Sequence, residues 1–194
     1  RGLLLEHPDI NVLVGFNEPL AVGTAMAVDE LELNGQVREI AFDTNPVCVE
    51  LLQKGEEPPF DIENSIVYYV GPTPAKPGHP IGSAGPTTSY RMDAYAPTLL
   101  DLGQLAMIGK GQRSDEVKEA VVRNGAVYLA AIGGAAALMA RQIKSAEVIA
   151  FDDLGAEAVR RLYVEDLPLT VVLDCEGGDL YRQGREEYLK SVLK

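Results

Sequence analysis

Between residues 66 and 174, the spacing of hydrophobic residues switches repeatedly between a pattern typical of strands and one typical of helices. Short apolar runs rich in β-branched and aromatic residues, typical of buried strands, alternate with segments of helical spacing. The expected strands are residues 66–70, 106–109, 126–130, 147–151 and 169–174. The expected helices are residues 93–102, 115–124, 132–140 and 156–161. This alternation predicts an α/β fold in which helices pack on a sheet.

The helix over residues 115–124 carries clear signals at both ends. Ser114 is expected to cap it, because a serine hydroxyl can accept a hydrogen bond from a free backbone amide of the first turn. Asp115 and Glu116 suit the positive end of the helix, and Asn124-Gly125 is expected to close it.

The N-terminal part is harder to interpret. Residues 12–15 and 30–37 have strand-like patterns, and residues 47–54 predict a short helix that Gly55 ends. At the C-terminus, residues 185–193 form either a charged amphipathic helix or a frayed tail.

Length and composition limit the class of protein. The chain has 194 residues, and no stretch resembles a linker, so we expect a single domain over residues 1–194. A net charge of −12 argues against a nucleic-acid partner, because phosphate binding needs a basic face. No apolar run approaches the roughly 18 residues of a membrane-spanning helix, so no membrane partner is expected.

Two cysteines and two histidines limit metal chemistry. Cys48 and Cys175 are too few for a disulfide framework or a four-thiolate metal site, and we expect them to be buried, inert thiols of a cytoplasmic protein. His7 and His79 lie far apart beside prolines, so exposed loops are expected and no metal ligands are assigned.

Three glycine-bearing loops follow expected strands and precede expected helices: GSAGPTTSYRMD (residues 82–93), GKGQRS (109–114) and Gly133-Gly134. Such loops present free backbone amides at helix N-termini, where small anions bind, and loops at one sheet edge tend to converge. The prediction is a pocket for a carboxylate or phosphate.

The side chains of these loops have two interpretations each. Thr87, Thr88 and Ser89 supply hydroxyl donors, Arg91 can hold a carboxylate through two hydrogen bonds, and Lys110 adds a charge. Equally, the loops can be plain turns, Arg91 can pair with Asp93 or another neighbour, and Lys110 and Arg113 can be solvated. Spacing alone leaves both open.

Four segments in order resemble one family: GSAGPTTSYRMD, MIGKGQRSDEV (107–117), YLAAIGGAAALMARQIKS (128–145) and LYVEDLP (162–168). They are similar to the iron–sulfur hydro-lyases, specifically to the C-terminal domain of class I fumarases or the β subunit of two-subunit fumarase and L-tartrate dehydratase. The resemblance covers about residues 49–181. It implies a swivelling β/β/α domain with helices packed on a mixed sheet.

The resemblance also implies a reaction and a partner. The family adds water to, or removes it from, a dicarboxylic acid such as fumarate/malate or tartrate. Its 4Fe–4S cluster is bound through three cysteines by the other domain or α subunit, so this chain is expected to be active only in a hetero-oligomer with that subunit.

Individual roles follow from matching positions. The resemblance places Thr87 at a catalytic threonine that takes part in proton abstraction and Lys110 at a catalytic lysine near the substrate. Arg91 falls at the arginine that binds the substrate carboxylate, with Thr88 and Gly85 beside it in the substrate-binding motif.

One departure from the family pattern stands out. The family carries an arginine ahead of its VELL helix, where this chain has Phe42, and residues 1–45 are divergent. A substrate contact is therefore expected to be missing. The alternative function is a non-catalytic module, derived from the same domain, that binds an anion or a partner.

Overall fold

The computed structural model of the protein describes residues 12–15, 38–41 and 45–193, with the backbone alone for residues 12–15, 38–41 and 45–48. Residues 1–43 and 44–194 form two compact units. The expected strand over residues 30–37 and the departure at Phe42 lie outside the described residues. The single domain over the whole chain stays a prediction.

The first unit contains a pair of parallel strands. β1 (Val12–Gly15) lies beside β2 (Arg38–Ala41), and Val12 faces Arg38 in the register. The strand expected at residues 12–15 is confirmed.

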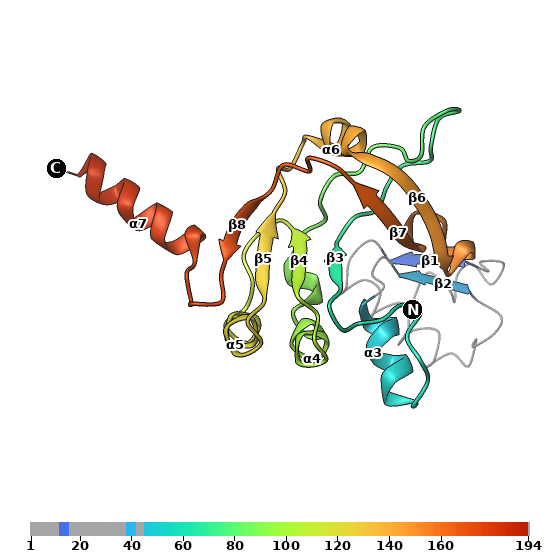
Figure 1. Cartoon of the computed structure of the whole chain (residues 1–194), viewed down its shortest axis with the longest axis horizontal. Coiled ribbons are helices and arrows are strands. Elements are labelled where there is room, and N and C mark those ends of the chain that lie inside the picture. Colours follow the sequence, from blue (N-terminus) through green and yellow to red (C-terminus); the bar gives the residue numbers. More distant parts are fainter. Residues whose placement is uncertain (1–11, 16–37, 42–44, 194) are drawn as a thin grey trace, which may run out of the picture. The chain divides into compact units, whose positions relative to one another are not determined.

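The second unit is built on a four-stranded mixed sheet in the order β3-β4-β5-β8 (Figure 1). Its strands are β3 (Ile66–Tyr68), β4 (Ala106–Gly109), β5 (Val127–Ala130) and β8 (Thr170–Leu173). The first three are parallel and β8 runs antiparallel to β5. Parallel neighbours joined through helices confirm the predicted α/β fold with helices packed on a mixed sheet.

The helices lie between and beyond these strands. The α-helices are α3 (Asn45–Gln53), α4 (Ala96–Asp101), α5 (Asp115–Arg123), α6 (Ala136–Gln142) and α7 (Leu180–Val192), and the 3₁₀ turns are η1 (Ser89–Met92) and η2 (Asp152–Glu157). No described helix is both long enough and apolar enough to cross a membrane.

Side-chain alternation divides the sheet into two faces. Met107 and Tyr128 are fully buried among residues of α4 and α5, while their neighbours Ile108 and Leu129 belong to a separate cluster with Met139 of α6. Successive strand residues point to opposite faces, so one face forms the main core with α4 and α5.

The ends of α5 match the expectation. The Ser114 hydroxyl accepts a hydrogen bond from the Val117 amide at 3.4 Å, and Gly125 takes the left-handed conformation just after the helix, with φ of 63°. α4 is shorter than the predicted helix over residues 93–102, because Pro97 sits in its first turn and residues 93–95 form a turn that follows η1. α7 begins at Leu180, five residues before the expected tail helix.

The helix expected over residues 156–161 is wrong. η2 ends at Glu157, and β7 (Val159–Val164) then pairs antiparallel with β6 (Ile143–Ala150). Arginine and leucine favour helices locally, but pairing with β6 satisfies the backbone of this segment and overrides that preference. β6 itself begins four residues before the strand expected at 147–151.

The strand expected over residues 66–70 is shorter and less buried than predicted. β3 ends at Tyr68, and Ile66 is 63% exposed, because β3 is an edge strand whose outer face borders a hollow.

Candidate active site

Two of the three glycine-bearing loops are joined directly by backbone contacts. Thr88 and Lys110 form a parallel β-bridge, and the Ser89 amide donates to the Lys110 carbonyl at 2.9 Å. On the other side, the Thr87 amide donates to the Tyr69 carbonyl at 2.8 Å. Thr87 and Thr88 therefore lie as an extended segment between the end of β3 and the end of β4.

The third loop approaches from the end of β5. A Cβ placed on Gly133 would lie 3.7 Å from Cδ of Lys110, so the two loops are in van der Waals reach of each other. A Cβ on Gly85 would lie 2.9 Å from the Cβ of Ala136, too close for a real side chain without movement. Gly85 thus lets the motif pack against the start of α6, and the predicted convergence of the three loops is confirmed.

Arg91 and Lys110 are half-exposed at this junction. Arg91 comes from η1, directly after the Thr87–Thr88 segment, and Lys110 follows β4. Asp93 bonds to Arg113 and to the Ser114 amide, so within the described residues its ion pair is with Arg113 rather than with Arg91. The interpretation in which Arg91 pairs with Asp93 is wrong.

Arg113 is buried instead of solvated. Its side chain is fully covered, its Nε donates to Asp93 at 2.6 Å, and its guanidinium lies between the rings of Tyr69 and Tyr128, with ring centres 5.6 and 5.0 Å away. Nη1 also contacts the sulfur of Met107 at 3.1 Å. A buried cation needs such partners. Arg113 therefore supports the loops from the core and is not accessible to a ligand.

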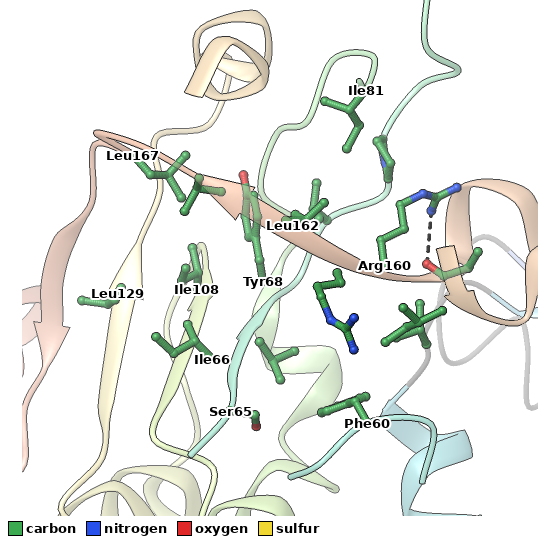
Figure 2. Close-up of a pocket in the computed structure, with 18 of the residues that line it drawn as sticks. Phe60, Ser65, Ile66, Tyr68, Ile81, Ile108, Leu129, Arg160, Leu162 and Leu167 are labelled. Carbon is green, nitrogen blue, oxygen red and sulfur yellow. Dashed lines mark hydrogen bonds between the residues drawn. The ribbon is translucent and has the colours of Figure 1, made fainter. Parts of the chain in front are cut away.

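A separate hollow of about 500 Å³ lies between the outer face of the sheet and the β6–β7 hairpin. Figure 2 shows Ile66, Tyr68, Ile108 and Leu129 on the sheet side, with Leu162 across from them. None of the residues predicted for the anion site lines it. Its mostly aliphatic walls do not suit a dicarboxylate, which needs cationic partners.

Two arginines line that hollow: Arg161 pairs with Glu147 at 3.5 Å, and Arg160 is bonded to backbone carbonyls. Arg160 donates to the carbonyls of Gly155, Ala156 and Ala158 at 2.6–3.1 Å, the last of these being the bond dashed in Figure 2. Its charge therefore closes the η2 turn and is not free for a ligand.

Glu157 lines the hollow and is close enough to Arg91 to be affected by its charge. A Cβ on Gly71 would come within 3.0 Å of Glu157 Oε1, so this carboxyl packs tightly against the backbone that follows β3. Burial raises the pKa of Glu157 above its ordinary value, and the charges of Arg91 and Arg160 oppose this rise.

This shift predicts a pH-dependent stability. A carboxyl whose pKa is raised in the folded state stabilises the fold at low pH, and that contribution is lost as the pH rises through the raised pKa. Replacing Glu157 with glutamine removes the cost of a buried charge, so the melting temperature of Glu157→Gln relative to the natural chain should be higher at pH 7 than at pH 4. Differential scanning calorimetry at both values measures this.

Asp101 is the contrasting control. Hydrogen bonds from Asn124 and Arg123 lower the pKa of this exposed carboxyl, so the relative melting temperature of Asp101→Asn should fall between pH 4 and pH 7. An equal change in the two variants would contradict the burial of Glu157.

The cysteines and histidines are partly described. Cys175 is exposed with a free thiol, so its predicted burial is wrong: it follows β8 in a polar turn that the apolar strand before it did not reveal. The side chain of Cys48 lies outside the described residues, as does His7, while His79 is exposed as expected. Across the described side chains, no three or more His, Cys, Asp or Glu residues gather as a metal site.

Two residues of this junction, Tyr128 and Tyr181, escaped the sequence argument, whereas Ser89 was predicted as a hydroxyl donor for an anion but is fully buried beneath the loop. Ser89, Tyr128 and Tyr181 all bond to the Lys110-Gly111 backbone through their hydroxyls or to one another. The available signal was Tyr128, a hydroxyl-bearing residue within a strand expected to be buried, since a buried tyrosine hydroxyl needs a partner.

Comparison of the sequence with known protein families shows which family carries this set of loops. The sequence model described as "Fumarase C-terminus" matches residues 19–184. The chain belongs to this family. The match begins about thirty residues nearer the N-terminus than the resemblance to the iron–sulfur hydro-lyases, which covers about residues 49–181.

The relatives fall into two groups by length. The chain is 42% identical over 136 residues to "Fumarate hydratase class I, anaerobic" of Escherichia coli, covering 69% of this chain and 25% of the relative. It is 40% identical to "Fumarate hydratase 1, mitochondrial" of Leishmania major, covering 89% and 33%. With "Putative L(+)-tartrate dehydratase subunit beta" of Methanocaldococcus jannaschii it shares 36% identity, covering 80% and 83%. The chain thus spans a quarter to a third of these fumarate hydratases, but most of the length of the subunit.

Proposed function

We propose that this chain is the β subunit of a heteromeric hydro-lyase that adds water to, or removes it from, a dicarboxylic acid. The sequence match to most of a tartrate dehydratase β subunit carries the proposal. In that match, this chain corresponds to a separate subunit and not to a whole enzyme. The joined Thr88 and Lys110 loops support the proposal, because they bring together two of the segments on which the resemblance to the hydro-lyases rests.

Arg91 and Lys110 supply the positive charge that a dicarboxylate needs. Arg91 holds one substrate carboxylate, with Thr88 and the backbone at Gly85 beside it. Removing a proton next to a carboxylate creates enolate-like charge, which the ammonium group of Lys110 stabilises. Both cations are half-exposed, so a substrate can reach them.

Thr87 takes part in the proton transfer. Its amide is held by the Tyr69 carbonyl and the residue is half-exposed, so a substrate can reach it. A neutral hydroxyl is a weak base at neutral pH, so a carboxylate of the partner subunit has to accept the proton through it. The catalytic site is then shared between two chains.

The 4Fe–4S cluster belongs to the partner subunit in this proposal. Class I fumarate hydratases imply such a cluster, but this chain has two cysteines, and the described one is an exposed single thiol. Its described side chains therefore do not fit a cluster bound through three cysteines. The substrate is fumarate/malate or tartrate, and we place the assembly in the cytoplasm without membrane or nucleic-acid partners.

Reconstitution tests the function. Co-expression with a cluster-bearing α subunit of this family under anaerobic conditions should give a stable complex that interconverts malate and fumarate or dehydrates tartrate. Ultraviolet absorbance of fumarate and detection of the oxo-acid from tartrate measure the two reactions. Each chain alone should be inactive, because each contributes only part of the site.

Two results would contradict this proposal. One is the absence of a complex together with no turnover of any of these acids. The other is tight binding of malate, fumarate or tartrate to the isolated chain in isothermal titration, which would favour a non-catalytic binding module.

A further inference from the structure

The backbone of Lys110 is held from below by a buried serine. Ser89 is fully buried, its amide donates to the Lys110 carbonyl at 2.9 Å, and its Oγ accepts from the Lys110 amide at 3.1 Å. Gly109 leaves the room for this contact, because a Cβ there would collide with Ser89 Oγ. Ser89 thus satisfies both polar groups of one residue.

Tyr128 extends this contact into the core. It is fully buried in β5, and its hydroxyl oxygen lies 2.9 Å from Ser89 Oγ and 3.0 Å from the Gly111 carbonyl. A tyrosine carries one hydroxyl hydrogen, so when it donates to Gly111 the Ser89 hydroxyl can donate back to it. Burial raises the pKa of Tyr128 to about 12, so the hydroxyl keeps its proton near neutral pH.

The next residue is held from another side. The Gly111 amide donates to the hydroxyl oxygen of Tyr181 at 3.2 Å, and Gly111 adopts a φ of 86°, which suits glycine alone among common residues. The peptide groups around Lys110 are therefore tied to β5, to η1 and to the start of α7. This sets the direction in which the Lys110 side chain leaves the backbone, toward Gly133.

We propose that Ser89 and Tyr128 are positioning residues of the active site, acting through the Lys110 backbone to hold its side chain beside the Gly133 loop. The inference rests on the proposed function, because it assigns a catalytic use to Lys110. A chain of three hydrogen bonds that ends on one catalytic residue is what precise placement of that residue requires.

A double-mutant cycle in the two-chain complex tests this inference. Tyr128→Phe should lower kcat/KM about 10-fold, since small displacements of a catalytic group have effects of this order or larger. In a Lys110→Met background, Tyr128→Phe should lower it less than about twofold further, because there is no lysine left to place. Tyr163→Phe is the control, since its exposed hydroxyl contacts only Glu165 among the described residues, and it should leave kcat/KM unchanged.

Amide hydrogen exchange gives a second readout that needs no turnover. In the full chain, Tyr128→Phe should speed exchange of the peptide containing Lys110 and Gly111 about 10-fold or more, while Tyr163→Phe leaves it as it is. Equal losses of kcat/KM in both backgrounds, or unchanged exchange at Lys110, would overturn the inference. If the natural complex proves inactive but exchange responds as expected, the proposed function fails while the backbone role of Tyr128 stands.

Discussion

Replacing Asp93 with alanine should lower the free energy of unfolding by about 3–5 kcal/mol. Asp93 is the ion-pair partner of Arg113, whose side chain is fully covered, at an Nε to Oδ1 distance of 2.6 Å. Without the carboxylate, a guanidinium would remain buried between two tyrosine rings, and one of its nitrogens, Nη2, already has no hydrogen-bond partner. Chemical denaturation of the isolated chain measures the effect.

The control for Asp93 is an exposed pair of the same chemistry. Asp101 and Arg123 are bonded at 2.7 Å with side chains 49% and 52% exposed, so Asp101→Ala should cost less than about 1 kcal/mol. Adding Arg113→Leu to Asp93→Ala should recover part of the lost stability, because the unpaired charge is removed. A loss for Asp93→Ala no greater than that for Asp101→Ala would show that the Arg113 pair is not isolated from water.

Replacing Arg91 with alanine should lower kcat/KM of the two-chain complex about 100- to 1,000-fold. The guanidinium is half-exposed on η1, beside the Thr88 loop, and its proposed partner is a substrate carboxylate. Removing a cation that faces developing negative charge costs transition-state stabilisation, whereas a half-exposed side chain contributes little to folding. Steady-state kinetics should therefore show a large loss with a change in melting temperature of only a few degrees.

Two further variants distinguish a catalytic from a structural explanation of the Arg91→Ala result. Arg91→Lys keeps the charge but loses the paired hydrogen bonds, so its kcat/KM should lie between those of the natural complex and Arg91→Ala. Arg182→Ala, an exposed arginine on α7, should leave the kinetics unchanged. Parallel losses of activity and thermal stability in Arg91→Ala would assign this arginine a structural role instead.

The sequence was most informative where the interactions are local. Ser114, Asp115 and Gly125 determine the ends of α5 through groups a few residues apart, and the structure has this helix at the expected place. The glycines of the three loops likewise marked the strand-to-helix turns, since these depend on backbone conformation. The family resemblance added the roles of Thr87 and Arg91, which stay predictions.

The sequence was least informative where a partner lies far along the chain. The segment after Glu157 has helix-forming residues but pairs with β6. Nothing in its own sequence indicates that β6 is its pairing partner. Arg113 resembled a solvated loop residue until the fold placed Asp93 and two tyrosines around it. Cys175 was misjudged because the apolar strand just before it suggested burial, whereas it lies in the exposed turn after β8.

The spacing of hydrophobic residues, the helix-capping residues and the sequence motifs by themselves determined the α/β class, the position of α5 and the set of loops that carry the candidate chemistry. Only the tertiary structure decided that Thr88 and Lys110 bridge each other, that Asp93 belongs to Arg113 rather than to Arg91, and that Tyr128 reaches Ser89. The physical reason is that local signals act through backbone geometry over a few residues, whereas the pairing of distant polar groups depends on which surfaces the folded chain removes from water.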